Sequence, residues 1–164
     1  MKLDNSRRLA ATAAVVFAAA LPASLAVAAE ISRDEYIARV EPICKKNVDA
    51  NTRIFKGAKA EVKAGELKKG SKHFLRAATA LGKTIKQIEA VPTPTQDEAM
   101  LNRWTGLLHT EQSYFQKIGE ALGSGNKYRA QSLSVKLNRN SNLANNAILA
   151  LDFEYCRIDP SRFS

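Results

Sequence analysis

The chain has 164 residues, of which 45% are hydrophobic, 7% aromatic and 25% charged. This composition is typical of one small globular domain, and it excludes a collagen-like chain, a disulfide-dense chain and a chain with long disordered tails. Lys and Arg number 25 against 16 Asp and Glu, which gives a formal net charge of +9 at pH 7.

The first 28 residues predict a secretory signal peptide. Lys2, Arg7 and Arg8 provide a basic start, residues 9–21 are apolar except for one Thr, and residues 26–28 form an Ala-Val-Ala cleavage site. An uncleaved membrane anchor is the alternative, but the apolar stretch is mostly Ala and is followed by a Pro. Cleavage after residue 28 leaves 136 residues with 22 basic and 15 acidic side chains, a net charge of +7.

Two cysteines, Cys44 and Cys156, follow the predicted signal peptide. Because exported proteins reach an oxidising compartment, an even number of cysteines predicts a disulfide, and with two cysteines in one chain only one pairing exists. The chain has no C-x-x-C or C-x-x-C-H motif. Thioredoxin-like chemistry, a zinc ribbon and covalently attached haem are therefore excluded.

The first predicted helix begins at a capping box formed by Ser32 and Glu35. Apolar side chains then recur at helical spacing over residues 36–62, and Gly65 supplies a stop. Pro42 lies inside this run, where it removes a backbone hydrogen bond. Since the apolar spacing continues beyond it, we expect a kink and not a break.

Three further helices are predicted over residues 67–91, 95–122 and 127–151. A Pro-Thr-Pro connection ends the second helix, and a Gly-Ser-Gly-Asn turn ends the third. A second capping box, Thr95 and Glu98, should begin the third helix. No segment shows the alternation of apolar and polar residues that is typical of strands.

Four amphipathic helices with short connections predict an all-α fold, an antiparallel up-down-up-down four-helix bundle over residues 29–156. Residues 157–164 should form a short polar tail. In this arrangement the first and last helices are neighbours, so Cys44 and Cys156 meet at the same end. A disulfide that closes a loop of this length, 112 positions, should stabilise the fold by roughly 4–5 kcal/mol.

Three short segments carry a resemblance to a known group of proteins. They are Tyr-Ile and Ile-Cys-Lys-Lys-Asn within residues 36–47, Pro-x-Pro at residues 92–94, and Leu-Asp-Phe-x-x-Cys at residues 151–156. In these segments the chain resembles small secreted helical proteins of unknown function from high-GC Gram-positive bacteria, often called hypothetical proteins or lipoproteins. The resemblance implies a helical fold and an extracytoplasmic location, and it implies no catalytic residues.

Basic residues are concentrated in the first half of the predicted bundle. Residues 45–86 contain twelve Lys and Arg against three Asp and Glu. This charge should attract an anionic envelope polymer or phospholipid headgroups; a solvated polar face is the alternative. Nucleic acid is not favoured, because no aromatic residues interleave with the lysines. The candidate anion-binding residues are Lys45, Lys46, Lys56, Lys59, Lys63, Lys68, Lys69 and Lys72.

His73 and His109 are the only histidines. We expect them on neighbouring antiparallel helices, a turn or two apart in height, where they could ligate haem or a metal in the bundle interior. Partly exposed polar side chains are the alternative. Four aromatic residues could line a small apolar pocket or simply pack in the core: Trp104, Tyr114, Phe115 and Tyr128.

No catalytic motif appears: the chain has no Gly-rich phosphate loop, no G-x-S-x-G, no H-E-x-x-H and no His–Cys nucleophile pair. We therefore expect no enzyme and no bound cofactor. The favoured function is a secreted module of the cell envelope that contacts an anionic surface or a protein partner through the basic hairpin of the first two helices. The alternative is a carrier that holds a small ligand, haem or a metal in the bundle interior.

Overall fold

The computed structural model describes residues 30–157, which are helical and contain no strand. The all-α prediction is therefore confirmed for this part of the chain. The predicted signal peptide, and the predicted tail beyond residue 157, lie outside the described residues. The elements are α1 (Arg33–Ile54), α2 (Ala58–Lys63), α3 (Leu67–Glu89), the 3-10 helix η1 (Thr95–Asp97), α4 (Glu98–Gly123) and α5 (Lys127–Ala147).

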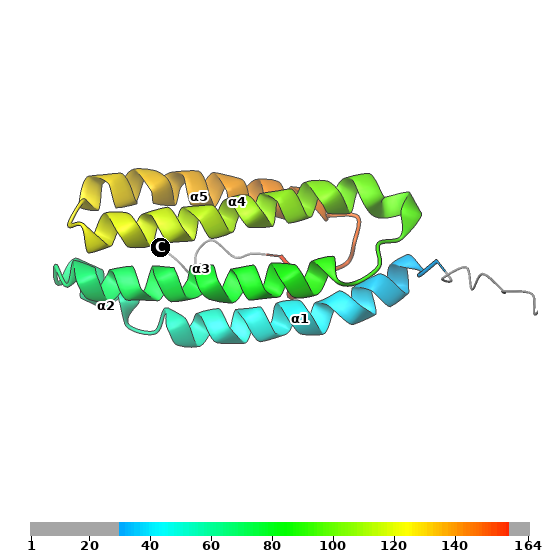
Figure 1. Cartoon of the computed structure of the whole chain (residues 1–164), viewed down its shortest axis with the longest axis horizontal. Coiled ribbons are helices and arrows are strands. Elements are labelled where there is room, and N and C mark those ends of the chain that lie inside the picture. Colours follow the sequence, from blue (N-terminus) through cyan, green and yellow to red (C-terminus); the bar gives the residue numbers. More distant parts are fainter. Residues whose placement is uncertain (1–29, 158–164) are drawn as a thin grey trace, which may run out of the picture.

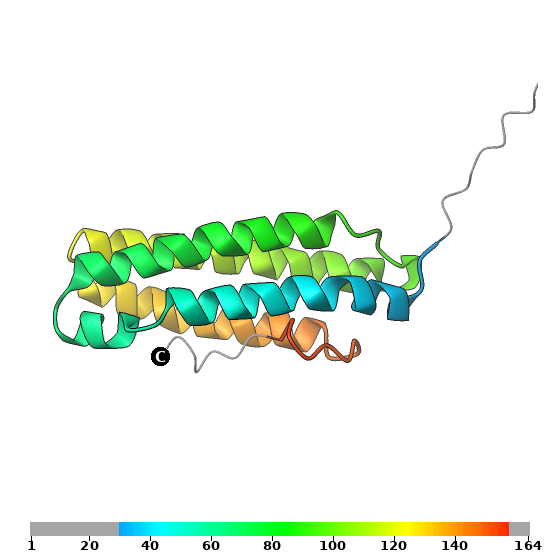
Figure 2. The same ribbon diagram turned by 90° about the horizontal axis from the view of Figure 1, so that it is seen from below.

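The four long helices α1, α3, α4 and α5 lie side by side, and each runs opposite to the one before it (Figures 1 and 2). The closest packing is between α3 and α4 and between α4 and α5, while α1 and α2 both lie against α3. After α5 the chain turns back, and residues 148–157, which we name the returning segment, run toward α1 (Figure 2). None of the described helices is long and apolar enough to cross a membrane.

The first predicted helix is two helices in the structure, so the expected number of four is wrong. The chain leaves α1 at Phe55, and Gly57 adopts a left-handed backbone conformation with φ of 84°. Glycine accepts this conformation without steric strain, and it ends an α-helix. By contrast, α1 runs through Pro42 without a break, as the continuing apolar spacing predicted.

Of the two predicted capping boxes, the one at the start of α1 is partly formed and the one before α4 is not. At α1 the backbone N–H of Glu35 donates to Ser32 Oγ at 3.1 Å, as expected. The second capping box is wrong: Thr95 begins a 3-10 turn, and its own N–H donates to the Glu30 carboxylate at 3.0 Å.

An ion pair between Arg33 and Asp97 joins the start of α1 to the start of α4. Arg33 Nε donates to Asp97 Oδ2 at 2.9 Å, and its Nη2 donates to Oδ1 at 2.6 Å. The Asp97 carboxylate is buried, and its hydrogen bonds and its negative charge raise the pKa of the Arg33 guanidinium. A two-pronged bond of this kind fixes orientation as well as distance.

The last predicted helix is shorter than expected, because α5 ends at Ala147. Ile148, Leu151 and Phe153 are nevertheless buried, so the apolar pattern continues into the returning segment after the helix has ended. This segment carries Cys156, whose sulfur lies 2.06 Å from that of Cys44. The predicted proximity of the two cysteines is therefore confirmed, although Cys156 reaches α1 through a turned-back segment and not from the end of a helix.

Candidate ligand-binding site

A cavity of about 600 Å³ lies between α1, α3, α4 and the returning segment; we name it the inner cavity. Its volume falls within the range of roughly 300–1,000 Å³ that small-molecule sites occupy. Most of the wall is apolar or aromatic. The lining residues include Cys44, Asn47, Val48 and Asn51 from α1, Thr84 from α3, Trp104, Leu108, Glu111 and Phe115 from α4, and Tyr155, Cys156 and Arg157 from the returning segment.

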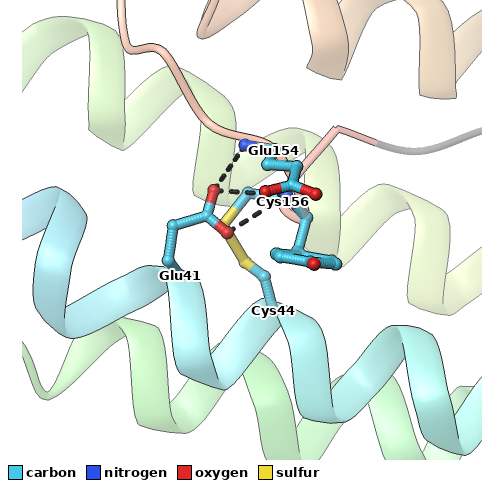
Figure 3. The surroundings of a disulfide bond; sticks show 5 residues. Glu41, Cys44, Glu154 and Cys156 are labelled. Atoms are coloured by element: carbon cyan, nitrogen blue, oxygen red, sulfur yellow. Dashed lines mark hydrogen bonds between the residues drawn. A yellow bond between two sulfur atoms is a disulfide. The ribbon is translucent and has the colours of Figure 1, made fainter.

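The returning segment forms one side of the inner cavity and is anchored at several points. The disulfide joins it to α1, and the Glu41 carboxylate accepts the backbone N–H groups of Glu154 at 2.6 Å and of Tyr155 at 3.1 Å (Figure 3). Phe153 stacks on Trp104 of α4 with ring centroids 5.7 Å apart. The wall of the cavity is thus held by covalent, polar and aromatic contacts to two different helices.

Four buried polar atoms in the residues of this wall have no hydrogen-bond partner within the part of the chain that the structure describes. They are Asn47 Oδ1, Asn51 Oδ1, Trp104 Nε1 and Glu111 Oε2. A buried polar atom without a partner destabilises a fold by about 1–3 kcal/mol, so native proteins keep few of them. The cavity beside them is large enough for water or another bound molecule to supply the missing partners.

Among residues 30–157, Glu111 is the only acidic residue that lines the inner cavity, and its side chain is almost completely buried. Burial raises the pKa of its carboxyl from 4.5 to about 8, and the Ser141 hydroxyl on α5 opposes this rise more weakly. The carboxyl is therefore mostly protonated at pH 7. A buried carboxyl with a raised pKa beside a cavity is typical of functional sites.

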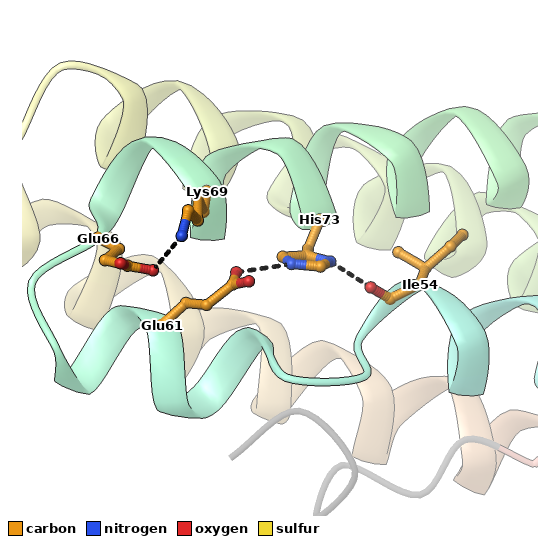
Figure 4. A network of polar contacts seen from close by, with 5 residues as sticks. All are labelled: Ile54, Glu61, Glu66, Lys69 and His73. Carbon is orange, nitrogen blue, oxygen red and sulfur yellow. Dashed lines mark hydrogen bonds and ion pairs between the residues drawn. The ribbon is translucent and has the colours of Figure 1, made fainter.

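The two histidines contact different partners. His73 Nδ1–H donates to the carbonyl of Ile54, and its Nε2 lies 2.8 Å from Glu61 Oε2, so the ring joins the end of α1, α2 and α3 (Figure 4). His109 Nε2 lies 2.8 Å from Glu89 Oε1 on the exposed surface. His73 therefore holds the two helices on either side of the α1–α2 break against α3.

The structure does not bring His73 and His109 together. Gly82 of α3 lies opposite Gln112 of α4, which places His109 at the level of residue 85, twelve residues along α3 from His73. At 1.5 Å per residue this corresponds to about 18 Å, and not to the expected turn or two. Among residues 30–157 no group of three or more His, Cys, Asp and Glu could hold a metal ion.

The eight lysines predicted to bind anions are all exposed, along α1, the α1–α2 break, α2 and the start of α3. Lys45 lies 3.6 Å from Asp49, and Lys69 lies 2.8 Å from Glu66. A second hollow, about 510 Å³, lies between α2 and α5 and has an apolar floor. The cationic residues that line it are Lys59, Lys63 and Lys127.

Of the four aromatic residues considered from the sequence, Trp104 and Phe115 line the inner cavity. Tyr114 is half-buried and does not line the cavity. Tyr128 is 84% exposed, so it neither packs in the core nor lines the cavity. Sequence reasoning missed Glu111, although a signal existed. It occupies an apolar-stripe position of α4, between Leu108 and Phe115 at helical spacing.

Comparisons with known proteins give no relative from which a function could be taken: no family model matches the chain, and no curated protein and no solved structure matches it. The resemblance stated from the sequence stays a prediction. The function is therefore argued from the inner cavity and from the charged surface.

Proposed function

We propose that the protein binds a small, largely apolar molecule in the inner cavity and acts as a non-catalytic carrier. We further propose that the mature chain is an up-down-up-down four-helix bundle with α2 as a short addition, and that it is exported after cleavage behind residue 28. A disulfide that joins distant segments is typical of proteins outside the cytosol, which supports this location.

One observation carries the binding proposal: a cavity of about 600 Å³ in which four unpartnered polar atoms lie among aromatic and aliphatic walls. Protein interiors are normally close-packed, and buried polar groups normally have partners. In this chain a large hollow and several buried polar atoms without a protein partner occur at the same place. Binding sites for small molecules are built in this way, with a mostly apolar surface and a few placed polar groups.

Filling the cavity should weaken binding. Val48 lines the cavity from α1, so the larger side chain of Val48→Phe should occupy the space and weaken the binding of octan-1-ol by roughly tenfold or more. The chain has one tryptophan, and Trp104 lies in the cavity wall, so its fluorescence reports binding directly.

Ala38→Phe is the matched control, because Ala38 is exposed on the same helix and does not line the cavity. This variant should bind octan-1-ol as the unmodified protein does. Equal binding by Val48→Phe and by the unmodified protein would place the ligand outside the cavity and contradict the proposal.

Contact with an anionic surface is a second candidate function, favoured by the exposed lysines around α2 and by the cationic hollow between α2 and α5. Haem or metal binding by the two histidines is not proposed, because they lie far apart.

Binding to vesicles that contain phosphatidylglycerol should fall steeply between about 50 and 500 mM NaCl, because salt screens exposed charges. Lys59→Glu with Lys63→Glu should abolish it, whereas Arg103→Glu with Lys117→Glu on the exposed face of α4 changes the net charge equally and should weaken it less. Sedimentation with the vesicles measures both effects, and equal losses in the two double variants would show that only the net charge matters.

A further inference from the structure

The unpartnered atoms of the inner cavity are unevenly divided between acceptors and donors. Two are the amide oxygens of Asn47 and Asn51, which accept hydrogen bonds, and one is the indole N–H donor of Trp104. The fourth, Glu111 Oε2, accepts once the carboxyl is ionised, and the Ser141 hydroxyl of α5 interacts with the same carboxyl. A molecule that satisfies this set with Glu111 ionised must supply several donors. One of the three oxygens also belongs to a group that can carry a negative charge.

We propose that the ligand is an amphipathic primary amine, whose ammonium group donates to Asn47, Asn51 and Glu111 and whose apolar body lies along Phe115 and Leu108. This inference rests on the proposed function, because it names the class of molecule that the inner cavity takes. An ammonium group has three N–H donors and no acceptor, and a carboxylate gives it the strong, charge-assisted partner that burial of a cation requires.

Other ligand classes fit the same atoms less well. An alcohol offers a single donor, so it leaves at least one of the two amide oxygens without a partner. A carboxylate offers only acceptors, so it could bond to the protonated Glu111 carboxyl but would face the amide oxygens of Asn47 and Asn51 without a donor. Aromatic rings at Trp104 and Phe115 also favour a cation, because their faces attract positive charge.

Besides Glu111, two charged residues of the described chain line the inner cavity. The segment after α1 contributes Lys56 and the returning segment contributes Arg157, and both are exposed at the surface. The lining residues of α3 carry no charge, and those of α4 carry none besides Glu111. The described residues that line the cavity therefore include no buried cation that competes for the Glu111 carboxylate, and from α5 the neutral Ser141 hydroxyl faces it.

Binding should release a proton. At pH 7 the amine is in solution as an ammonium ion, and the Glu111 carboxyl holds its proton because burial raises its pKa to about 8. When the ammonium group enters, the carboxyl transfers its proton to the buffer, and an ion pair without net charge remains. Close to one proton per bound amine should be released, whereas a neutral ligand should release none.

The experiment compares n-octylamine, octan-1-ol and octanoate, which have the same chain and different heads. Binding to the full protein is measured by Trp104 fluorescence and by titration calorimetry at pH 7 in two buffers of different ionisation enthalpy, which counts the protons released. Octylamine should bind at least about tenfold more tightly than the other two. It alone should release a proton.

Glu111→Gln keeps the shape of the protonated side chain, but the amide cannot ionise. It should weaken octylamine binding about tenfold or more and abolish proton release, while octan-1-ol binding stays within about twofold. Glu120→Gln, an exposed position on the same helix, should leave all three ligands unchanged.

The outcomes separate the two proposals. If octan-1-ol or octanoate binds as tightly as octylamine, or if octylamine releases no proton, the amine proposal is overturned and the binding function stands. If none of the three ligands binds, both are overturned.

Discussion

Replacing both cysteines, Cys44→Ser with Cys156→Ser, should lower the free energy of unfolding by about 4–5 kcal/mol. The bond closes a loop with a sequence separation of 112 residues, and loops of this length restrict the unfolded chain by about that amount in the chain-entropy description. For a domain whose total stability is about 5–15 kcal/mol, this is a large share. Urea unfolding followed by circular dichroism measures the difference.

The same variant should also weaken ligand binding, because Tyr155, Cys156 and Arg157 form part of the cavity wall. Without the bond, the returning segment keeps the Glu41 hydrogen bonds, the Phe153 stacking on Trp104, the contact of the Lys45 ammonium with the Tyr155 ring and its buried apolar side chains. The segment should then separate from α1 more often, so that octan-1-ol binds less tightly to the folded protein at low urea.

Glu41→Gln provides the control for the disulfide variant. It keeps the covalent bond and weakens the acceptor that holds Glu154 and Tyr155, so it should cost about 1–3 kcal/mol and leave octan-1-ol binding largely intact. If the double serine variant unfolds at the same urea concentration as the unmodified protein, the polar and aromatic contacts alone hold the segment, and the chain-entropy argument does not apply here.

The helices could be predicted because their signal is local. Apolar side chains at helical spacing report which face of a helix is buried, and no knowledge of its neighbours is needed. The same property explains the missed break at Gly57: Ile54 and Ala58 on either side are both buried, so the apolar spacing continues across the break. Only the left-handed conformation, which glycine adopts easily, interrupts the helix there.

The end of α5 was misjudged for a related reason. Ala144, Ile148 and Leu151 follow one another at helical spacing and are all buried, but only Ala144 is in the helix. The later two belong to the returning segment, which packs against the bundle without being helical. A local pattern shows that a side chain is buried and does not show which backbone conformation buries it.

The inner cavity could not be predicted from spacing, because it depends on how far α1 lies from the other helices. That distance is set by tertiary contacts such as the disulfide and the pair of Arg33 and Asp97. One residue nevertheless marked the site in the sequence. Glu111 places a carboxyl among Trp104, Leu108 and Phe115 on the buried face of α4, where an apolar residue is expected.

The raised pKa of Glu111 should make the protein less stable as the pH rises. In the unfolded chain the carboxyl ionises near pH 4.5, whereas in the folded protein burial raises its pKa to about 8. Between these values the folded state binds one proton more than the unfolded state, so the free energy of unfolding falls by up to about 1.4 kcal/mol per pH unit. The contribution of Glu111 to the free energy of unfolding is therefore fully present below pH 4.5, and it is lost as the pH rises through 8.

Glu111→Gln removes this dependence, because its amide is neutral at every pH. Urea unfolding at pH 5, 6, 7 and 8 should show a falling stability for the unmodified protein and a flatter profile for Glu111→Gln, which should be the more stable of the two at pH 8. Glu120→Gln, exposed on the same helix, should follow the unmodified protein. If the unmodified protein and Glu111→Gln give parallel profiles, the carboxyl ionises in the folded protein as it does in the unfolded chain, and water or a counter-charge must reach it inside the cavity.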